Sequence, residues 1–139
     1  MQLQSQLDED LPTAYFDAEG IQRALLNIVT NALDAVETVD EGAVHVQTGH
    51  DEKTDAVFIS VTDNGPGIPA EQIERVFNVF ESTKGARGTG LGLAVSRKIV
   101  REHGGEITVE SRPNEGCRFV LSWPRIEEDQ RPAQASTMV

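Results

Sequence analysis

The most informative part of the sequence is Asp63-Asn64-Gly65-Pro66-Gly67, together with a second glycine-rich stretch, Gly88-Thr89-Gly90-Leu91-Gly92-Leu93. Glycine has no Cβ atom, so backbone N–H groups in such segments can closely approach a phosphate or a flat base. The carboxylate of Asp63 and the amides of Asn27 and Asn31 add the hydrogen-bonding groups that a nucleotide needs. We therefore predict a nucleotide site, and ATP is the expected nucleotide.

Size and composition fit one compact cytoplasmic domain. The chain has 139 residues, of which 38% are hydrophobic, enough for an ordinary core. No window contains the roughly 20 apolar residues of a membrane span, and the first residues lack the regions of a signal peptide. The single cysteine, Cys117, suits a reducing compartment. We expect a cytoplasmic domain without direct membrane contact, in a full-length protein that could itself carry a membrane anchor.

The formal net charge of −11 narrows the choice of partners. Nucleic acid and anionic lipid would be repelled at long range, so we expect a protein or a small ligand instead. An acidic chain that binds a polyphosphate must gather its few cations, or a metal ion, near the phosphates. Lys84 and Arg87, beside the second glycine-rich stretch, are suitable cations.

Hydrophobic periodicity predicts alternating strands and helices. Apolar residues at helical spacing predict a long helix over residues 18–37, with Asp17 as its N-cap. Asn27 and Asn31 lie one turn apart on the edge of its apolar stripe. Shorter helices are expected over residues 71–76 and 89–103. Alternating apolar residues predict strands around Val44 and Val46, around Val57, Ile59 and Val61, around Ile107 and Val109, and around Phe119, Leu121 and Trp123.

This order of elements predicts an α+β fold. We expect a two-layer α/β sandwich with a mixed, mostly antiparallel sheet, an edge strand near the N-terminus and helices on one face. Residues 1–125 should form the domain. Residues 126–139 are predicted to be a disordered tail, because their apolar content falls.

The arrangement resembles the ATP-binding domain of the GHKL superfamily, the Bergerat fold shared by sensor histidine kinases, the gyrase B subunit, heat-shock chaperones and mismatch-repair ATPases. Four segments are similar to the family's boxes and occur in the family's order. They are residues 27–32 (N box), 63–67 (first glycine box), 77–80 (F box) and 88–93 (second glycine box). One box alone is weak evidence, but four in order over residues 3–124 are specific.

Within the superfamily, the resemblance is closest to the histidine kinases of two-component phosphorelay systems. Hydrolytic members carry a glutamate that orients the attacking water at the position of Asn27. An amide cannot accept a proton from water at neutral pH, so we expect slow hydrolysis. The lid sequence Glu81-Ser82-Thr83-Lys84 is similar to that of nitrogen-regulation-type kinases.

The resemblance assigns the adenine contacts to the first glycine box. Asp63 would accept a hydrogen bond from the exocyclic amine of adenine, whereas an ordinary Asx turn would be its structural role. Gly65 and Gly67 would leave room for the base, and Ile68 would pack beside it. Cys117 departs from the family's usual threonine, which helps to hold a water molecule near adenine. A thiol donates weakly, so that indirect contact is in doubt here.

The resemblance also assigns phosphate and metal contacts. Asn31 is the expected Mg²⁺ ligand, and Asn27 would bind phosphate oxygens or metal-bound water. Asn27, Lys84 and Arg87 are the candidate catalytic residues, although ordinary surface charge remains the alternative for the two cations. The other phosphate contacts are expected from Thr83, Gly88, Thr89, Gly90, Leu91 and Gly92.

The phosphoacceptor is expected outside this chain. None of His45, His50 and His103 is followed by the acidic residue and proline that are typical of the family's acceptor histidine. We therefore expect a separate helical dimerisation and phosphoacceptor domain, with a response regulator as the later partner. Three alternatives remain, namely an anti-sigma-type serine kinase, a hydrolysing GHKL ATPase, and an interaction module with a degenerate site.

Overall fold

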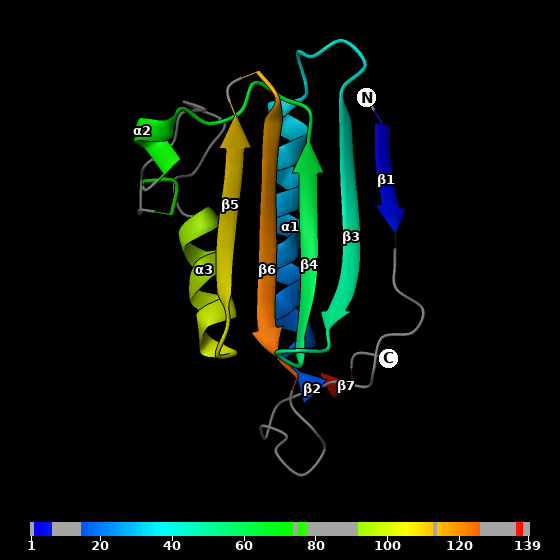
Figure 1. The fold of residues 1–139 in the computed structure, drawn as a ribbon, viewed down its shortest axis with the longest axis vertical. Helices are drawn as coiled ribbons and strands as arrows, with labels where there is room; N and C mark the ends of the chain where they lie inside the picture. The colour runs from blue at the N-terminus through cyan, green and yellow to red at the C-terminus, as the bar shows by residue number, and fades with distance from the viewer. Residues whose placement is uncertain are drawn as a thin grey trace.

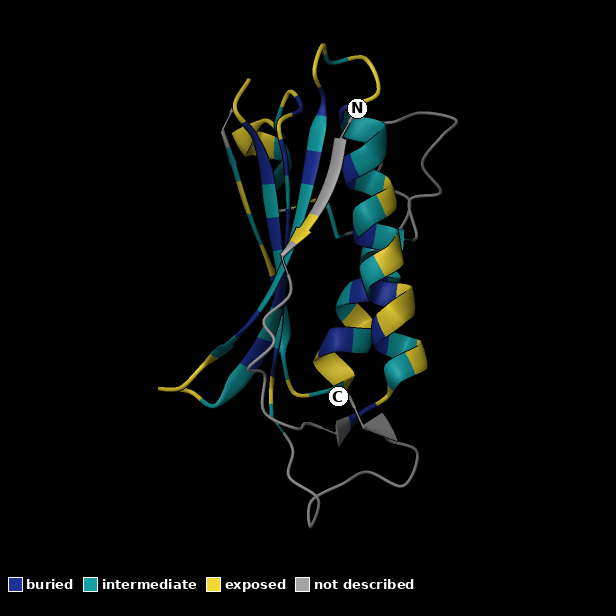
Figure 2. Cartoon of the chain, turned by 90° about the vertical axis from the view of Figure 1, so that its right-hand side faces the viewer, coloured by how far each residue is buried: buried dark blue, intermediate teal, exposed yellow. Residues whose placement is uncertain are grey.

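The computed structural model of the chain describes residues 2–6, 15–73, 75–77, 92–112, 114–125 and 136–137. The described residues form a five-stranded sheet with helices on one of its faces, as Figures 1 and 2 show from two directions. This is the predicted two-layer α+β sandwich. Among the described helices, none is both long and apolar enough to cross a membrane.

The sheet is mixed but mostly antiparallel, as predicted. Its strand order is β1-β3-β4-β6-β5, and only the β1/β3 pair is parallel. The strands are β1 (Gln2–Gln6), β3 (Ala43–Asp51), β4 (Ala56–Asp63), β5 (Glu106–Arg112) and β6 (Gly116–Pro124). The expected edge strand near the N-terminus is thus β1.

Three helices complete the described fold. The long helix α1 (Ala18–Ala35) begins where the sequence predicts, because the Asp17 carboxylate accepts a hydrogen bond from the Gly20 N–H at 3.1 Å. It lies behind the central strands in Figure 1, beside α3 (Gly92–Glu102), while the short α2 (Ala70–Ile73) lies near the upper end of β5.

The core lies between the sheet and the two longer helices. Strand register puts Val57 opposite Trp123, Ile59 opposite Leu121 and Val61 opposite Phe119, so alternate residues of β4 and β6 present one buried face. α1 contributes its predicted apolar stripe. The buried residues of that stripe are Ile21, Ala24, Ile28 and Ala32. The same alternation carries Asp63 to the end of the buried face of β4.

Two helices are shorter than predicted. α1 ends at Ala35, because the chain then turns through hydrogen bonds from Glu37 N–H to the Asp34 carbonyl and from Val39 N–H to the Val36 carbonyl. α2 ends at Ile73, and Arg75 and Val76 continue only as a turn. These hydrogen bonds join residues three positions apart rather than four, so they wind the chain more tightly than an α-helix does. The predicted start of the third helix, residues 89–91, lies outside the described residues.

A second, two-stranded sheet joins distant parts of the chain. β2 (Tyr15–Phe16) pairs antiparallel with β7 (Ser136–Thr137), with Tyr15 opposite Thr137. These two C-terminal residues fall in the segment for which the sequence predicts disorder. The remaining residues of that segment, 126–135 and 138–139, lie outside the described part of the chain, so their disorder stays a prediction.

A glycine pair after α3 allows a sharp stability test. A Cβ atom on Gly105 would lie 1.9 Å from the Ser122 carbonyl oxygen, whereas on Gly104 it would have no neighbour closer than 3.7 Å. Gly104 instead has a positive φ of 79°. We expect Gly105→Ala to lower the free energy of unfolding by more than about 3 kcal/mol. Gly104→Ala should cost about 1–2 kcal/mol. Urea denaturation measures both, and equal costs would contradict the packing argument.

Candidate functional site

Asp63 ends β4 as a buried carboxylate held by its own loop. The residue is only 6% exposed, and its Oδ1 atom accepts a hydrogen bond from the Gly65 N–H at 2.9 Å. A Cβ atom on Gly65 would lie 2.9 Å from the Ala35 carbonyl oxygen and 3.0 Å from Asp63 Oδ1. Glycine is therefore required at 65, because the loop packs directly against the last turn of α1.

Hydrogen bonds of the Asn64 side chain and of the Pro66 carbonyl hold this loop on two sides. Asn64 Oδ1 accepts from the Ala43 N–H at 2.8 Å, and its Nδ2 donates to the Glu41 carbonyl at 3.1 Å. On the other side, the Asn114 N–H donates to the Pro66 carbonyl at 2.7 Å. The glycine loop is thus tied to the α1–β3 connection and to the β5–β6 turn, two contacts that the sequence analysis missed.

Ile68, at the end of the glycine loop, is hydrogen-bonded to β5. Its N–H donates to Ser111 Oγ at 2.6 Å, and Ser111 Oγ donates to the Gly116 carbonyl at 3.2 Å. Gly67 turns the chain with a positive φ of 79°, which favours glycine. Gly67 and half-buried Ile68 therefore lie in the same anchored loop as Asp63.

The backbone of β6 packs directly against the backbone of Asp63 at Gly116. Gly116 has a φ of 96°, and a Cβ atom there would lie 2.0 Å from the Asp63 carbonyl oxygen. The next residue, Cys117, is the register partner of Asp63 and is itself buried. Cys117 thus lies beside Asp63, the residue expected to contact adenine, at a position where the family resemblance predicts threonine.

Asn27 and Asn31 lie half-buried along the C-terminal half of α1. The Asn27 Nδ2 atom donates to the Gly92 carbonyl at 3.2 Å, which ties the middle of α1 to the start of α3. Asn31 lies one turn further on, and Ala35, which touches the Asp63 loop, lies one turn beyond that. α1 thereby brings the first glycine box, the N box and the last part of the second glycine box into one arrangement.

Part of the predicted site lies outside the described residues. This applies to the lid and to most of the second glycine box, so the roles of these residues stay predictions. They are Thr83, Lys84, Arg87, Gly88, Thr89, Gly90 and Leu91. Among the described residues, no group of three or more His, Cys, Asp or Glu side chains could hold a metal ion.

This geometry agrees with a match to a known family. Residues 16–127 match the model of the histidine kinase-, DNA gyrase B- and HSP90-like ATPase family. The chain belongs to this family. Because the matched region includes α1, both glycine boxes and four of the five strands of the main sheet, the Bergerat-fold expectation is confirmed.

Individual relatives are histidine kinases. The chain is 41% identical over 124 residues to the sensor histidine kinase ZraS of Escherichia coli O157:H7, covering 89% of this chain and 26% of ZraS. It is 34% identical to the catalytic domain of histidine kinase ThkA, with a TM-score of 0.76, covering 89% of this chain and 78% of that one. ThkA has also been solved in complex with the response regulator protein TrrA, with 30% identity, a TM-score of 0.71 and coverage of 89% and 34%.

These comparisons make the chain a catalytic domain of the histidine kinase type. The chain spans about a quarter to a third of the length of the curated relatives that it matches.

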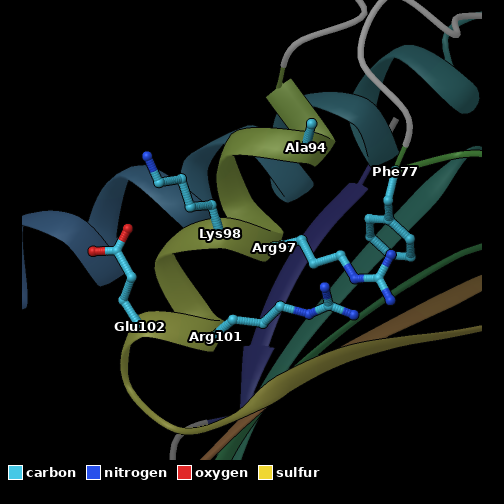
Figure 3. A pocket seen from close by; sticks show the side chains of 6 residues that line it. All are labelled: Phe77, Ala94, Arg97, Lys98, Arg101 and Glu102. Atoms are coloured by element: carbon cyan, nitrogen blue, oxygen red, sulfur yellow. The ribbon is translucent and has the colours of Figure 1, made fainter.

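A separate groove of about 430 Å³ lies on the basic side of α3 of this histidine kinase-type domain. Its lining residues are Phe77, Ala94, Arg97, Lys98, Arg101 and Glu102. Figure 3 shows Arg97 and Arg101 extending from α3 in one direction, while Lys98 and Glu102 extend in another. The Arg97 guanidinium lies 5.0 Å from the centre of the Phe77 ring, a cation–π contact.

Glu106 at the start of β5 pairs with both arginines. Its carboxylate accepts from Arg97 Nε at 3.2 Å and from Arg101 Nη2 at 2.9 Å. Desolvation alone would raise its pKa, but hydrogen bonds from Arg101, from the Ile107 N–H and from Arg97 together lower the pKa from 4.5 to about 2. These ion pairs join α3 to β5 beside the groove, whose lining contains no residue of the glycine boxes.

The Glu106 pairing predicts acid sensitivity. Because its folded pKa lies below its unfolded value, the stabilisation is present above pH 4.5 and is lost as the pH falls toward 2. The side chain is 44% exposed, so solvent screening limits this contribution to about 1 kcal/mol. When the pH is lowered from about 6 to about 3, we expect the free energy of unfolding to fall less in Glu106→Gln than in wild type.

Urea denaturation at both pH values measures this difference. The control is Glu110→Gln. Glu110 is an exposed glutamate further along β5, and its substitution should keep the wild-type pH dependence. An unchanged pH dependence in Glu106→Gln would contradict the ion-pair assignment.

Proposed function

We propose that this domain binds Mg-ATP and presents the γ-phosphate to a histidine on a separate helical dimerisation and phosphoacceptor domain. One observation carries the proposal: a buried carboxylate, Asp63, is held by a glycine loop against the end of the helix that carries Asn31. The loop and the helix thus have a fixed relation before any ligand arrives. Pre-organisation of this kind lowers the entropic cost of binding.

Asp63 is the proposed adenine-recognition group. Its carboxylate can only accept hydrogen bonds, which suits the exocyclic amine of adenine and opposes the carbonyl group of guanine at that position. The Gly65 N–H holds one carboxylate oxygen, so the group is oriented without help from the ligand. Gly65 and Gly67 keep side chains away from the base, and Ile68 offers it an apolar neighbour.

Asn31 is the proposed protein ligand of Mg²⁺. An amide oxygen is a hard neutral ligand, and triphosphate oxygens and water would supply the remaining positions. The metal ion, when bound, would neutralise charge on the phosphates. Asn27, together with Thr83, Lys84, Arg87 and residues 88–92, would bind the phosphate oxygens.

Phosphoryl transfer would depend on positioning and charge neutralisation rather than on covalent chemistry. The amide of Asn27 cannot act as a hydrolytic base, which disfavours rapid ATP hydrolysis. A response regulator would then receive the phosphoryl group from the acceptor histidine, and the complex of ThkA with TrrA supports a partner of that class. The site of action is proposed to be the cytoplasm.

The adenine assignment is tested by Asp63→Asn. The amide would offer an N–H group or a weaker acceptor to the exocyclic amine, so we expect ATP binding to weaken about a hundredfold. Isothermal titration calorimetry with ATP and GTP measures this loss. Asp51→Asn, the same chemical change at an exposed strand end, is the matched control and should bind as wild type does. Wild-type affinity in Asp63→Asn would remove Asp63 from the adenine contact.

The transfer reaction is tested with γ-labelled ATP and an added acceptor. We expect acid-labile label on a helical acceptor domain and none on this chain alone. Asn31→Ala should lower the Mg²⁺-dependent rate by about a hundredfold or more while adenosine binding persists. Thr30→Ala, at an exposed neighbour on α1, is the control. Acid-stable label on a serine would favour the serine kinase instead, and rapid phosphate release would favour the ATPase.

A further inference from the structure

Among the described residues, side-chain hydrogen bonds join the α1 and α3 regions at three places along their contact. Asn27 Nδ2 donates to the Gly92 carbonyl at 3.2 Å, and buried Ser96 Oγ donates to the Ala24 carbonyl at 3.0 Å. The Asp17 N–H donates to His103 Nε2 at 3.0 Å. Residue numbers fall along α1 as they rise along α3, so the helices run antiparallel and the bonds occupy one end, the middle and the other end of their contact.

The contacts of His103 favour one tautomer of its ring. Its Nδ1 atom lies 2.8 Å from the Ile99 carbonyl oxygen, which can only accept a hydrogen bond. Its Nε2 atom faces the Asp17 N–H, which can only donate one. These two contacts fit the tautomer that carries its proton on Nδ1 and its lone pair on Nε2. Either a proton on Nε2 or a rotated ring would break the bond to α1.

The first turn of α1 and the last turn of α3 are in close contact at this end. A Cβ atom on Gly20 would lie 3.4 Å from Ile99 Cγ2. Ile99 also accepts the His103 bond, so the last turn of α3, the ring and the first turn of α1 form one contact. A shift of α3 along α1 would break this contact and both other interhelical bonds together.

We propose that His103 is a positioning residue for the phosphate side of the nucleotide site, because its ring fixes α3 on α1 and so places Gly92 beside Asn27. The inference rests on the proposed nucleotide function. It adds that His103, the residue directly after α3, controls the geometry at the beginning of that helix. The mechanical link is the α3 helix itself, eleven residues long.

Two conservative variants separate this role from simple stabilisation. In His103→Gln the side-chain oxygen can take the position of Nε2 and accept from the Asp17 N–H, while the bond to Ile99 is lost. In His103→Asn the side-chain nitrogen can take the position of Nδ1 and donate to Ile99, but the side chain is too short to reach Asp17. Each variant loses one hydrogen bond, and only the asparagine variant loses the bond between the helices.

Nucleotide affinity gives the decisive readout. We expect His103→Asn to bind ATP about threefold to tenfold more weakly than wild type, and His103→Gln to stay within about twofold. Adenosine, which lacks phosphates, should bind both variants and wild type equally. Thermal melts of all three proteins check folding. Equal ATP affinity in the two variants, or losses that only follow their melting temperatures, would overturn the positioning role.

Nitrogen NMR of the imidazole gives a second readout that needs no nucleotide. In the full wild-type chain, His103 should show a protonated Nδ1 and an unprotonated Nε2. A proton on Nε2 at neutral pH would overturn the inference while leaving the ATP proposal intact. If wild type bound neither ATP nor adenosine, the proposed function would fail first, and the positioning role would fall with it.

Discussion

Burial of one face of α1 against the sheet is the constraint on which the remaining structure depends. The helix contributes four buried apolar residues to the core, and its half-buried edges carry both asparagines of the N box. Its last turn contacts the Asp63 loop through Gly65, and its middle and first turns hold α3. Because a packed helix is stiff, groups attached at these places keep fixed separations. The candidate site is therefore assembled on a single rigid element.

Much of this arrangement could be predicted from local patterns. The helical stripe and the Asp17 cap predicted α1, and apolar alternation predicted β3, β4, β5 and β6. Two-residue periodicity also explains why Asp63, in phase with Val61 and Ile59, emerges on the helix-covered face. The family boxes predicted the glycine loop, because their chemistry is written in consecutive residues. The predicted positions of the helix ends were less accurate, since the hydrogen bonds of turns after Ala35 and Ile73 compete with α-helical ones.

The missed features are bonds between residues far apart in sequence. His103 and Asp17 are 86 positions apart, and Ile68 and Ser111 are 43 apart. No local pattern reports such partners, because they depend on how the helices and strands are packed. The ion pairs of Glu106 had only a weak signal, two arginines four residues apart on α3. Asn64 resembled an ordinary turn residue, yet its amide joins two connections of the sheet.

The fixed positions of Phe77 and Gly92 have a consequence for how such domains diversify. Phe77 packs on the Phe119 ring with centroids 6.2 Å apart, and Gly92 is bonded to Asn27. Both ends of the intervening stretch are thereby anchored to the core. Sequence changes between Phe77 and Gly92 therefore leave both anchors in place, so this stretch can diversify during evolution while the core that holds the anchors stays the same.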